Sequence, residues 1–186
     1  MSNTKILNTI PTGATFKIGN IEFIKFTDEN GIVTAVSKNI LFNSCFGKNN
    51  DLSKSDILAK LTNEILPEIE DIIGAENVVE FETDLLSLDG SAKHGKITSK
   101  ISIPTFDFYR RNRAVFEMHK INKWWWLATP DSTSEYNNDD WCVCVSPSGS
   151  VYNNDYDDFN CGVRPILSFV SSISVSWTNK KWLKTI

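Results

Sequence analysis

The chain has 186 residues, of which 41% are hydrophobic, and its formal net charge is −4. A chain of this length buries roughly 70% of its unfolded surface, so it needs neither disulfides nor a structural metal to fold, and its composition excludes intrinsic disorder. Residues 131–161 hold seven acidic residues and no Lys or Arg, which argues against nucleic-acid binding through this segment.

The first residues lead into no long apolar run, and no stretch of the sequence reaches the length of a membrane span. We therefore expect cytoplasmic synthesis without a signal peptide and no membrane insertion. If the protein is exported, we expect a partner or a phage particle to carry it. The four cysteines form no recognisable framework, so reduced thiols are expected.

Residues 15–41 predict antiparallel strands. Short β-forming runs are separated by turn signals at Gly19-Asn20 and at residues 28–31. A helix is predicted next, with Ser53 as its N-cap. Its buried face would carry Ile57, Leu58, Leu61 and Ile65. A second short helix is expected to begin at Pro67, to bury Ile69, Ile72 and Ile73, and to end at Gly74.

Residues 78–88 predict a strand, and residues 89–99 predict a polar loop. Pro104 is expected to open a short helix whose cluster of arginines is surface charge. Residues 124–130 predict a strand that ends at Pro130. Three adjacent Trp cannot share one face, so Trp125 should point away from Trp124 and Trp126.

A hairpin is predicted for residues 141–150, with its turn at Pro147-Ser148-Gly149. Its residues alternate, so one face would be buried and the other displayed. The expected buried residues are Trp141, Val143 and Val145, and the expected displayed residues are Cys142, Cys144 and Ser146. Residues 153–160 predict an irregular loop, residues 162–167 a strand that returns to the core, and residues 170–186 an edge strand.

These elements predict an α+β fold, mostly antiparallel sheet with one or two packed helices. We expect a single domain over residues 1–186. Residues 1–130 would form a scaffold, residues 131–165 a variable ligand-binding region with its closing strand, and residues 166–186 a C-terminal strand and tail.

The polar segment between residues 136 and 161 is the predicted binding surface. It contains one Trp and no Lys, Arg, Glu, Gln or Met, and it combines Tyr with Asn, Asp and Ser in the manner of an antibody paratope. The same composition is also typical of plain turns. The predicted ligand-binding residues are Tyr136, Asn137, Asn138, Asp139, Asp140, Cys142, Cys144, Ser146, Tyr152, Asn153, Asn154, Asp155, Tyr156, Asp157, Asp158, Phe159, Asn160 and Cys161. Four aromatic residues are the expected anchors, namely Tyr136, Tyr152, Tyr156 and Phe159.

Residues 124–130, the Gly149-Ser150-Val151 run and the closing Gly162-Val163-Arg164-Pro165 run resemble a bacterial and prophage domain family of unknown function. Its hallmarks are a Trp-Trp-Leu-Arg-Ser-Pro strand and a Gly-Val-Arg-Pro-Ala strand. This chain departs from them at Ala128-Thr129 and at Ile166. The resemblance covers most of the chain and implies a C-type-lectin-like fold of the superfamily that includes the formylglycine-generating enzymes.

Within that superfamily, the segment resembles the variable region of a diversity-generating retroelement target protein. Such systems mutate adenines in Asn codons, which never yields Lys, Glu, Gln, Met or Trp. The resemblance implies a hypervariable, non-enzymatic protein that recognises an unknown protein or carbohydrate. It also implies that the displayed residues of the hairpin are diversified and that its Trp and Val residues are fixed scaffold. A homo-oligomer or a phage particle would be its assembly.

Three alternatives remain open at this stage. An enzyme of the formylglycine-generating type would need paired reactive cysteines in a cleft, and no Lys, Arg or His lies near Cys142 and Cys144 in the sequence to activate a thiol. A metal site is the second alternative, although no cofactor is expected. Five oxygen-bearing residues from Asn153 to Asp158 could offer ligands to Ca²⁺. A zinc ion bound by three cysteines would lack a fourth ligand. A structural phage or surface component without a ligand of its own is the third.

Overall fold

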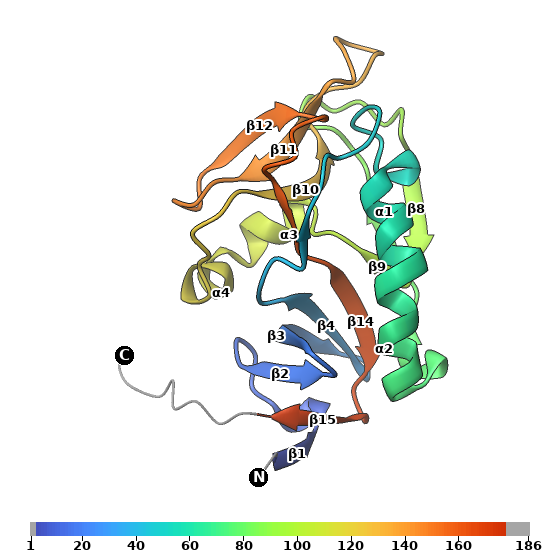
Figure 1. Ribbon diagram of the computed structural model, residues 1–186, viewed down its shortest axis with the longest axis vertical. Helices are drawn as coiled ribbons and strands as arrows, with labels where there is room; N and C mark the ends of the chain where they lie inside the picture. The colour runs from blue at the N-terminus through green and yellow to red at the C-terminus, as the bar shows by residue number, and fades with distance from the viewer. Residues whose placement is uncertain (1–2, 178–186) are drawn as a thin grey trace.

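The computed structural model describes residues 3–177 and shows a mixed α+β architecture built on curled, mostly antiparallel sheets. The predicted α+β class is confirmed. An eight-stranded sheet, a five-stranded sheet and one long helical run make up most of the molecule (Figure 1). The first and last described strands pair with each other at the end of the molecule opposite the predicted binding segment.

The larger sheet runs in the order β1-β15-β2-β3-β4-β14-β6, with β9 also paired to β14. Its strands are β1 (Asn3–Ile6), β2 (Thr15–Ile18), β3 (Ile21–Glu29), β4 (Ile32–Ser37), β6 (Val78–Val79), β9 (Ile101–Ser102), β14 (Ile166–Val170) and β15 (Ser174–Trp177). The predicted meander is β2-β3-β4. Its second turn is set by Asn30 and Gly31, which have φ of 52° and 79° and therefore match the twist of the flanking strands. Of the predicted edge strand over residues 170–186, β15 is described, and residues 178–186 lie outside the described chain.

One helical run, made of α1 (Asp56–Lys60), the π-helical segment η3 (Leu61–Ile65) and α2 (Leu66–Ile73), packs along the larger sheet (Figure 1). Its N-cap is Ser55, whose Oγ accepts a hydrogen bond from the backbone N–H of Leu58 at 3.0 Å, so the predicted cap at Ser53 is wrong by two residues. Pro67 follows the π turn, and the helix continues through it where a break was expected. Gly74 ends the helix as predicted, but Ile72 is 56% exposed and does not belong to the buried face.

The smaller sheet has the order β12-β11-β10-β13-β5 and carries the predicted hairpin. Its strands are β5 (Phe42–Asn43), β10 (Trp125–Pro130), β11 (Trp141–Val145), β12 (Val151–Asp155) and β13 (Gly162–Val163). The hairpin prediction is confirmed, with Val145 opposite Val151. The expected loop from residue 153 is wrong at its start, because β12 continues to Asp155.

Short elements complete the fold, and among them β7 and β8 pair as a separate two-stranded sheet. They are η1 (Leu7–Thr9), η2 (Leu52–Lys54), η4 (Ala75–Asn77), β7 (Phe81–Asp84), β8 (Lys96–Ser99), α3 (Phe106–Arg111) and α4 (Arg113–Met118). Strand β8 lies within the predicted polar loop. The predicted helix after Pro104 is confirmed as α3, and its Arg110 pairs locally with Asp107 at 2.9 Å, as surface charge.

The smaller sheet is covered on both faces. Trp126, with Cys142 and Cys144, packs into a core shared with the long helix and the larger sheet. Trp125, with Val143, packs into a second core under α3 and α4. The prediction that Trp125 points away from Trp126 is confirmed, and both indoles are buried.

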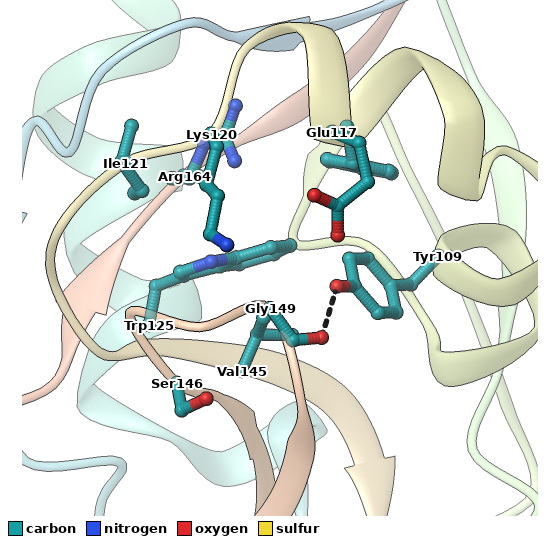
Figure 2. Close-up of a pocket in the computed structure, with 10 residues that line it drawn as sticks. Tyr109, Glu117, Lys120, Ile121, Trp125, Val145, Ser146, Gly149 and Arg164 are labelled. Atoms are coloured by element: carbon teal, nitrogen blue, oxygen red, sulfur yellow. Dashed lines mark hydrogen bonds between the residues drawn. The ribbon is translucent and has the colours of Figure 1, made fainter.

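Arg164 is buried where these layers meet. Its guanidinium lies 4.8 Å from the ring centre of Trp125 and 5.4 Å from that of Phe116, and its Nε donates to the carbonyl of Ser37 at 3.0 Å. Figure 2 shows the Trp125 indole with Arg164 on one side and the hairpin residues on the other. Burial lowers the pKa of Arg164 to about 9, so the side chain stays charged at neutral pH.

We expect Arg164→Lys to lower the free energy of unfolding by about 2 kcal/mol, because an ammonium cannot contact the rings of Trp125 and Phe116 and also reach the carbonyl of Ser37 as the guanidinium does. Chemical denaturation measures this. Arg110→Lys, at an exposed surface pair, should change stability by less than about 0.5 kcal/mol. Equal stability of the two variants would contradict the assigned role of Arg164.

Candidate functional site

The predicted binding segment forms one end of the molecule, where the β11–β12 hairpin and its flanking loops lie at the top of Figure 1. Strand β12 is the outermost strand of the smaller sheet, and β11 lies next to it. Two loops flank the hairpin. Residues 131–140 lead into β11, and residues 156–161 lead out of β12 towards β13.

The predicted display of alternate hairpin residues is wrong. Cys142, Cys144 and Cys161 have no exposed surface, and Ser146 is buried. Trp141, predicted to be buried, is 39% exposed. A side chain with no or almost no exposed surface cannot contact a ligand. The candidate contacts therefore no longer include Cys142, Cys144, Ser146 and Cys161.

The physical reason lies in the chemistry of free cysteine. A thiol is a small hydrophobe and is among the most buried side chains, so a Cys-Val-Cys-Val run is a nearly continuous apolar strand. A strand of this kind fits a sheet that is covered on both faces. The pattern predicts polar-out alternation only if Cys is counted as polar.

The three buried thiols are shielded from solvent, and Cys144 and Cys161 are hydrogen-bonded to each other. The hydrogen bond between Cys144 and Cys161, with burial, raises the pKa of Cys144, and burial raises the pKa of Cys142 well above its ordinary value. The same hydrogen bond lowers the pKa of Cys161, whose Sγ also accepts from Asn154 Nδ2 at 3.6 Å. All four cysteines are free thiols, as expected. Such thiols act as core side chains here.

Exposed aromatic side chains concentrate at this end of the molecule. Within residues 3–177, every aromatic side chain that is exposed lies between residues 124 and 159. They are Trp124, Tyr136, Trp141, Tyr152 and Phe159. Phe159 is 69% exposed and Tyr136 is 62% exposed, so exposure of these two predicted anchors is confirmed.

Three of these aromatic residues and three polar neighbours form one surface, which we call the hairpin patch. The patch consists of Trp124, Tyr152, Asn154, Asp158, Phe159 and Asn160. Trp124 and Tyr152 meet edge to face with ring centres 5.4 Å apart. Asn154, two residues along the same face of β12, donates to Asp158 at 2.5 Å, and the backbone N–H of Asn160 donates to Asp158 Oδ1 at 2.7 Å. Sequence reasoning missed Trp124, which directly precedes β10.

The fourth predicted anchor, Tyr156, is half-buried against the core. Its backbone N–H donates to the carbonyl of Asp140 at 2.9 Å, and its carbonyl accepts from Phe46 at 2.6 Å. Tyr156 therefore fixes the exit of β12. The remaining predicted residues are exposed or half-buried in the two loops and β12. They are Asn137, Asn138, Asp139, Asp140, Asn153, Asp155 and Asp157.

A buried polar network holds the loop of residues 131–140 in place through hydrogen bonds. Asn50 donates to the carbonyls of Ser132 and Trp141 at 2.8 and 2.9 Å, and His94 contacts Asn50 Oδ1 at 2.9 Å. Asp51 lies 3.8 Å from the other ring nitrogen of His94.

A second group of hydrogen bonds joins the same loop to residues 87–93. Thr133 donates to Ser91 at 2.7 Å, and Ser91 donates to Glu135 at 2.6 Å. Ser132 donates to Asp89 at 2.5 Å. Because the loop is ordered by its own scaffold, its outer side chains are held in place without a ligand.

The cavity in this region is small, and no cluster of metal ligands lies among the described residues here. The cavity between α4 and the hairpin turn, lined by Tyr109, Trp125 and Arg164, has a volume of about 10 Å³, room for a single water (Figure 2). Among residues 3–177, no group of three or more His, Cys, Asp or Glu is arranged to hold a metal ion. The Asp158 carboxylate, one of the residues considered for Ca²⁺, is hydrogen-bonded to Asn154 and Asn160.

Comparison with known proteins identifies no relative: no family model, no curated protein and no solved structure matches the chain. Within the described part of the chain, no helix has the length and apolar character needed to cross a membrane.

Replacing Asn50 with Asp should lower the free energy of unfolding by about 3 kcal/mol, since a buried carboxylate would face the two carbonyls that the amide now binds. Hydrogen exchange should show residues 131–141 opening first. Asn63→Asp, on the exposed side of the helical run, is the matched control and should leave both measurements unchanged.

Stability should also depend on pH through two half-buried histidines. Burial lowers the pKa of His94 and of His119 below 6.5. Because their folded pKa values are depressed, their contribution is complete above the unfolded pKa and is lost as pH falls through the folded values. Denaturation across pH 5–8 should show falling stability below about pH 6.5, and His94→Gln should flatten that slope. An unchanged slope in both His94→Gln and His119→Gln would refute the assignment.

Proposed function

We propose that this protein is a non-enzymatic ligand-binding protein that recognises a protein or carbohydrate through the hairpin patch and the loop of residues 131–140. The observation that carries the proposal is the concentration of exposed aromatic side chains there, since the rest of the described chain exposes only one more aromatic, Trp141, which directly follows the loop. Exposed aromatics give large contact area at low entropic cost, and they dominate binding energy at protein interfaces.

The surroundings of these aromatics support recognition over catalysis. Asn, Asp and Ser side chains flank them and can form adaptable hydrogen bonds. The nearby thiols are buried, and the adjacent cavity has room for one water only. A preformed surface suits non-covalent binding.

We further propose that the fold is C-type-lectin-like and that the surface is diversified by a retroelement. Support comes from the motif resemblance and from the exclusion of Lys, Glu, Gln and Met across residues 136–161. Burial of Cys142, Cys144 and Cys161 confines useful variation to the exposed positions. Genomic DNA tests this directly. A near-identical template repeat rich in Asn codons beside a reverse-transcriptase gene is expected, and its absence would favour a structural component without a ligand of its own.

Binding should depend on the patch aromatics. Screening the purified protein against a glycan array and a phage-displayed peptide library should yield a ligand. Tyr152→Ala and Phe159→Ala should each weaken that ligand's binding by about tenfold or more, with unchanged thermal stability. Leu86→Ala removes an exposed apolar side chain elsewhere and is the control. Retained affinity in both aromatic variants, or no ligand from either screen, would count against the proposal.

A further inference from the structure

The outer edge of β12 has free backbone groups. The hydrogen bonds from Ser146 N–H to Ser150 C=O, and from Tyr156 N–H to Asp140 C=O, fix which residues of β12 face β11. In an antiparallel pair these alternate, so Val151, Asn153 and Asp155 turn their N–H and C=O groups outward. The backbone groups of Asp155 are occupied by Asn154 and Asp158. Those of Val151 and Asn153 have no partner among the described residues.

This edge lacks the usual protection against strand pairing. Exposed edges are commonly kept very short or carry Lys or Pro. At the other end of the same sheet, β5 has two residues, and the edge strand β1 of the larger sheet carries Lys5. Strand β12 has five residues with neither Lys nor Pro. Between Val151 and Asn153 it therefore presents an unprotected edge to which an extended segment can dock.

The surroundings of the edge select the charge of what docks. Seven acidic residues and no Lys or Arg lie in residues 131–161, and Asp155, Asp157 and Asp158 follow the free backbone groups directly. Tyr152 lies on β12 and is in edge-to-face contact with Trp124, and both rings are exposed and can contact a cation. Pairing of two copies through β12 would bring two acidic segments together, which like-charge repulsion disfavours.

We propose that β12 binds its partner by strand addition, and that the partner is an extended protein segment bearing Lys or Arg. This rests on the proposed function and names the partner class. The partner's backbone pairs with Val151 and Asn153. Its basic side chains contact Trp124, Tyr152 and the carboxylates that follow β12.

The test uses the full chain and two capped peptides, one alternating Lys with Thr and one alternating Glu with Thr. In an amide-detected NMR titration, the Lys peptide should shift the amide signals of Val151 and Asn153, and the Glu peptide should shift neither. Asn153→Pro removes the outward N–H but no bond to β11, so it should weaken Lys-peptide binding by about tenfold, the effect of losing roughly one or two backbone hydrogen bonds. Asn153→Ala keeps the N–H and should bind like the parent.

If Asn153→Pro does not fold, an alternately N-methylated Lys peptide, which cannot pair as a strand, replaces it and should fail to bind. Equal binding by the methylated peptide or by Asn153→Pro, equal shifts from both charges, or absence of Lys-peptide binding each overturns strand addition. So does a concentration-dependent dimer through β12 in ultracentrifugation. None of these results bears on the library ligand, whose loss in Tyr152→Ala and Phe159→Ala tests the proposed function separately.

Discussion

The stacking of Arg164 on Trp125 is the interaction on which the arrangement of this molecule depends. Arg164 lies between β13 and β14 and reaches β4 through the carbonyl of Ser37. Trp125 lies in β10, and Phe116, which stacks on Trp125 with ring centres 5.5 Å apart and also contacts the guanidinium, lies in α4. One buried cation thus joins the two sheets to the helices. No carboxylate among residues 3–177 pairs with it, and its Nη2 has no hydrogen-bond partner there. Aromatic faces and one carbonyl take the place of water around the rest of the charge.

That junction also explains how the hairpin is held. Val145 packs in the same core as Trp125, and the hydroxyl of Tyr109 donates to the carbonyl of Gly149 at the hairpin turn, at 2.7 Å (Figure 2). The turn of the hairpin is therefore fixed to α3. At the opposite end of the hairpin, the polar network around Asn50 holds the loop of residues 131–140. Rigidity beneath a surface lowers the entropic cost of binding at that surface.

Much of the fold was predictable from local signals. Turn residues at Asn30-Gly31, the Gly74 stop and the hairpin turn at Pro147-Gly149 act through backbone geometry, which the sequence states directly. Burial was less predictable, because it depends on which layers cover a strand. Alternation in residues 141–146 indicated the right periodicity, but only the tertiary structure shows that both faces are covered. The exposure of Trp124 and Trp141 likewise depends on their positions at the starts of β10 and β11, which only the tertiary structure shows.

Burial of the cysteines sets a limit on any variation of this surface. A larger side chain at Cys142, Cys144 or Cys161 would overpack a core that also holds Trp126, and overpacking costs about 1–3 kcal/mol. Exposed positions such as Asn153, Asp157 and Asn160 carry no such constraint, since surface substitutions stay within about 0.5 kcal/mol. A diversified version of this protein would thus concentrate its tolerated changes on the outer strand and its two loops. These are the positions where a partner strand and its side chains would make contact, so change in recognition and retention of the fold are compatible in this architecture.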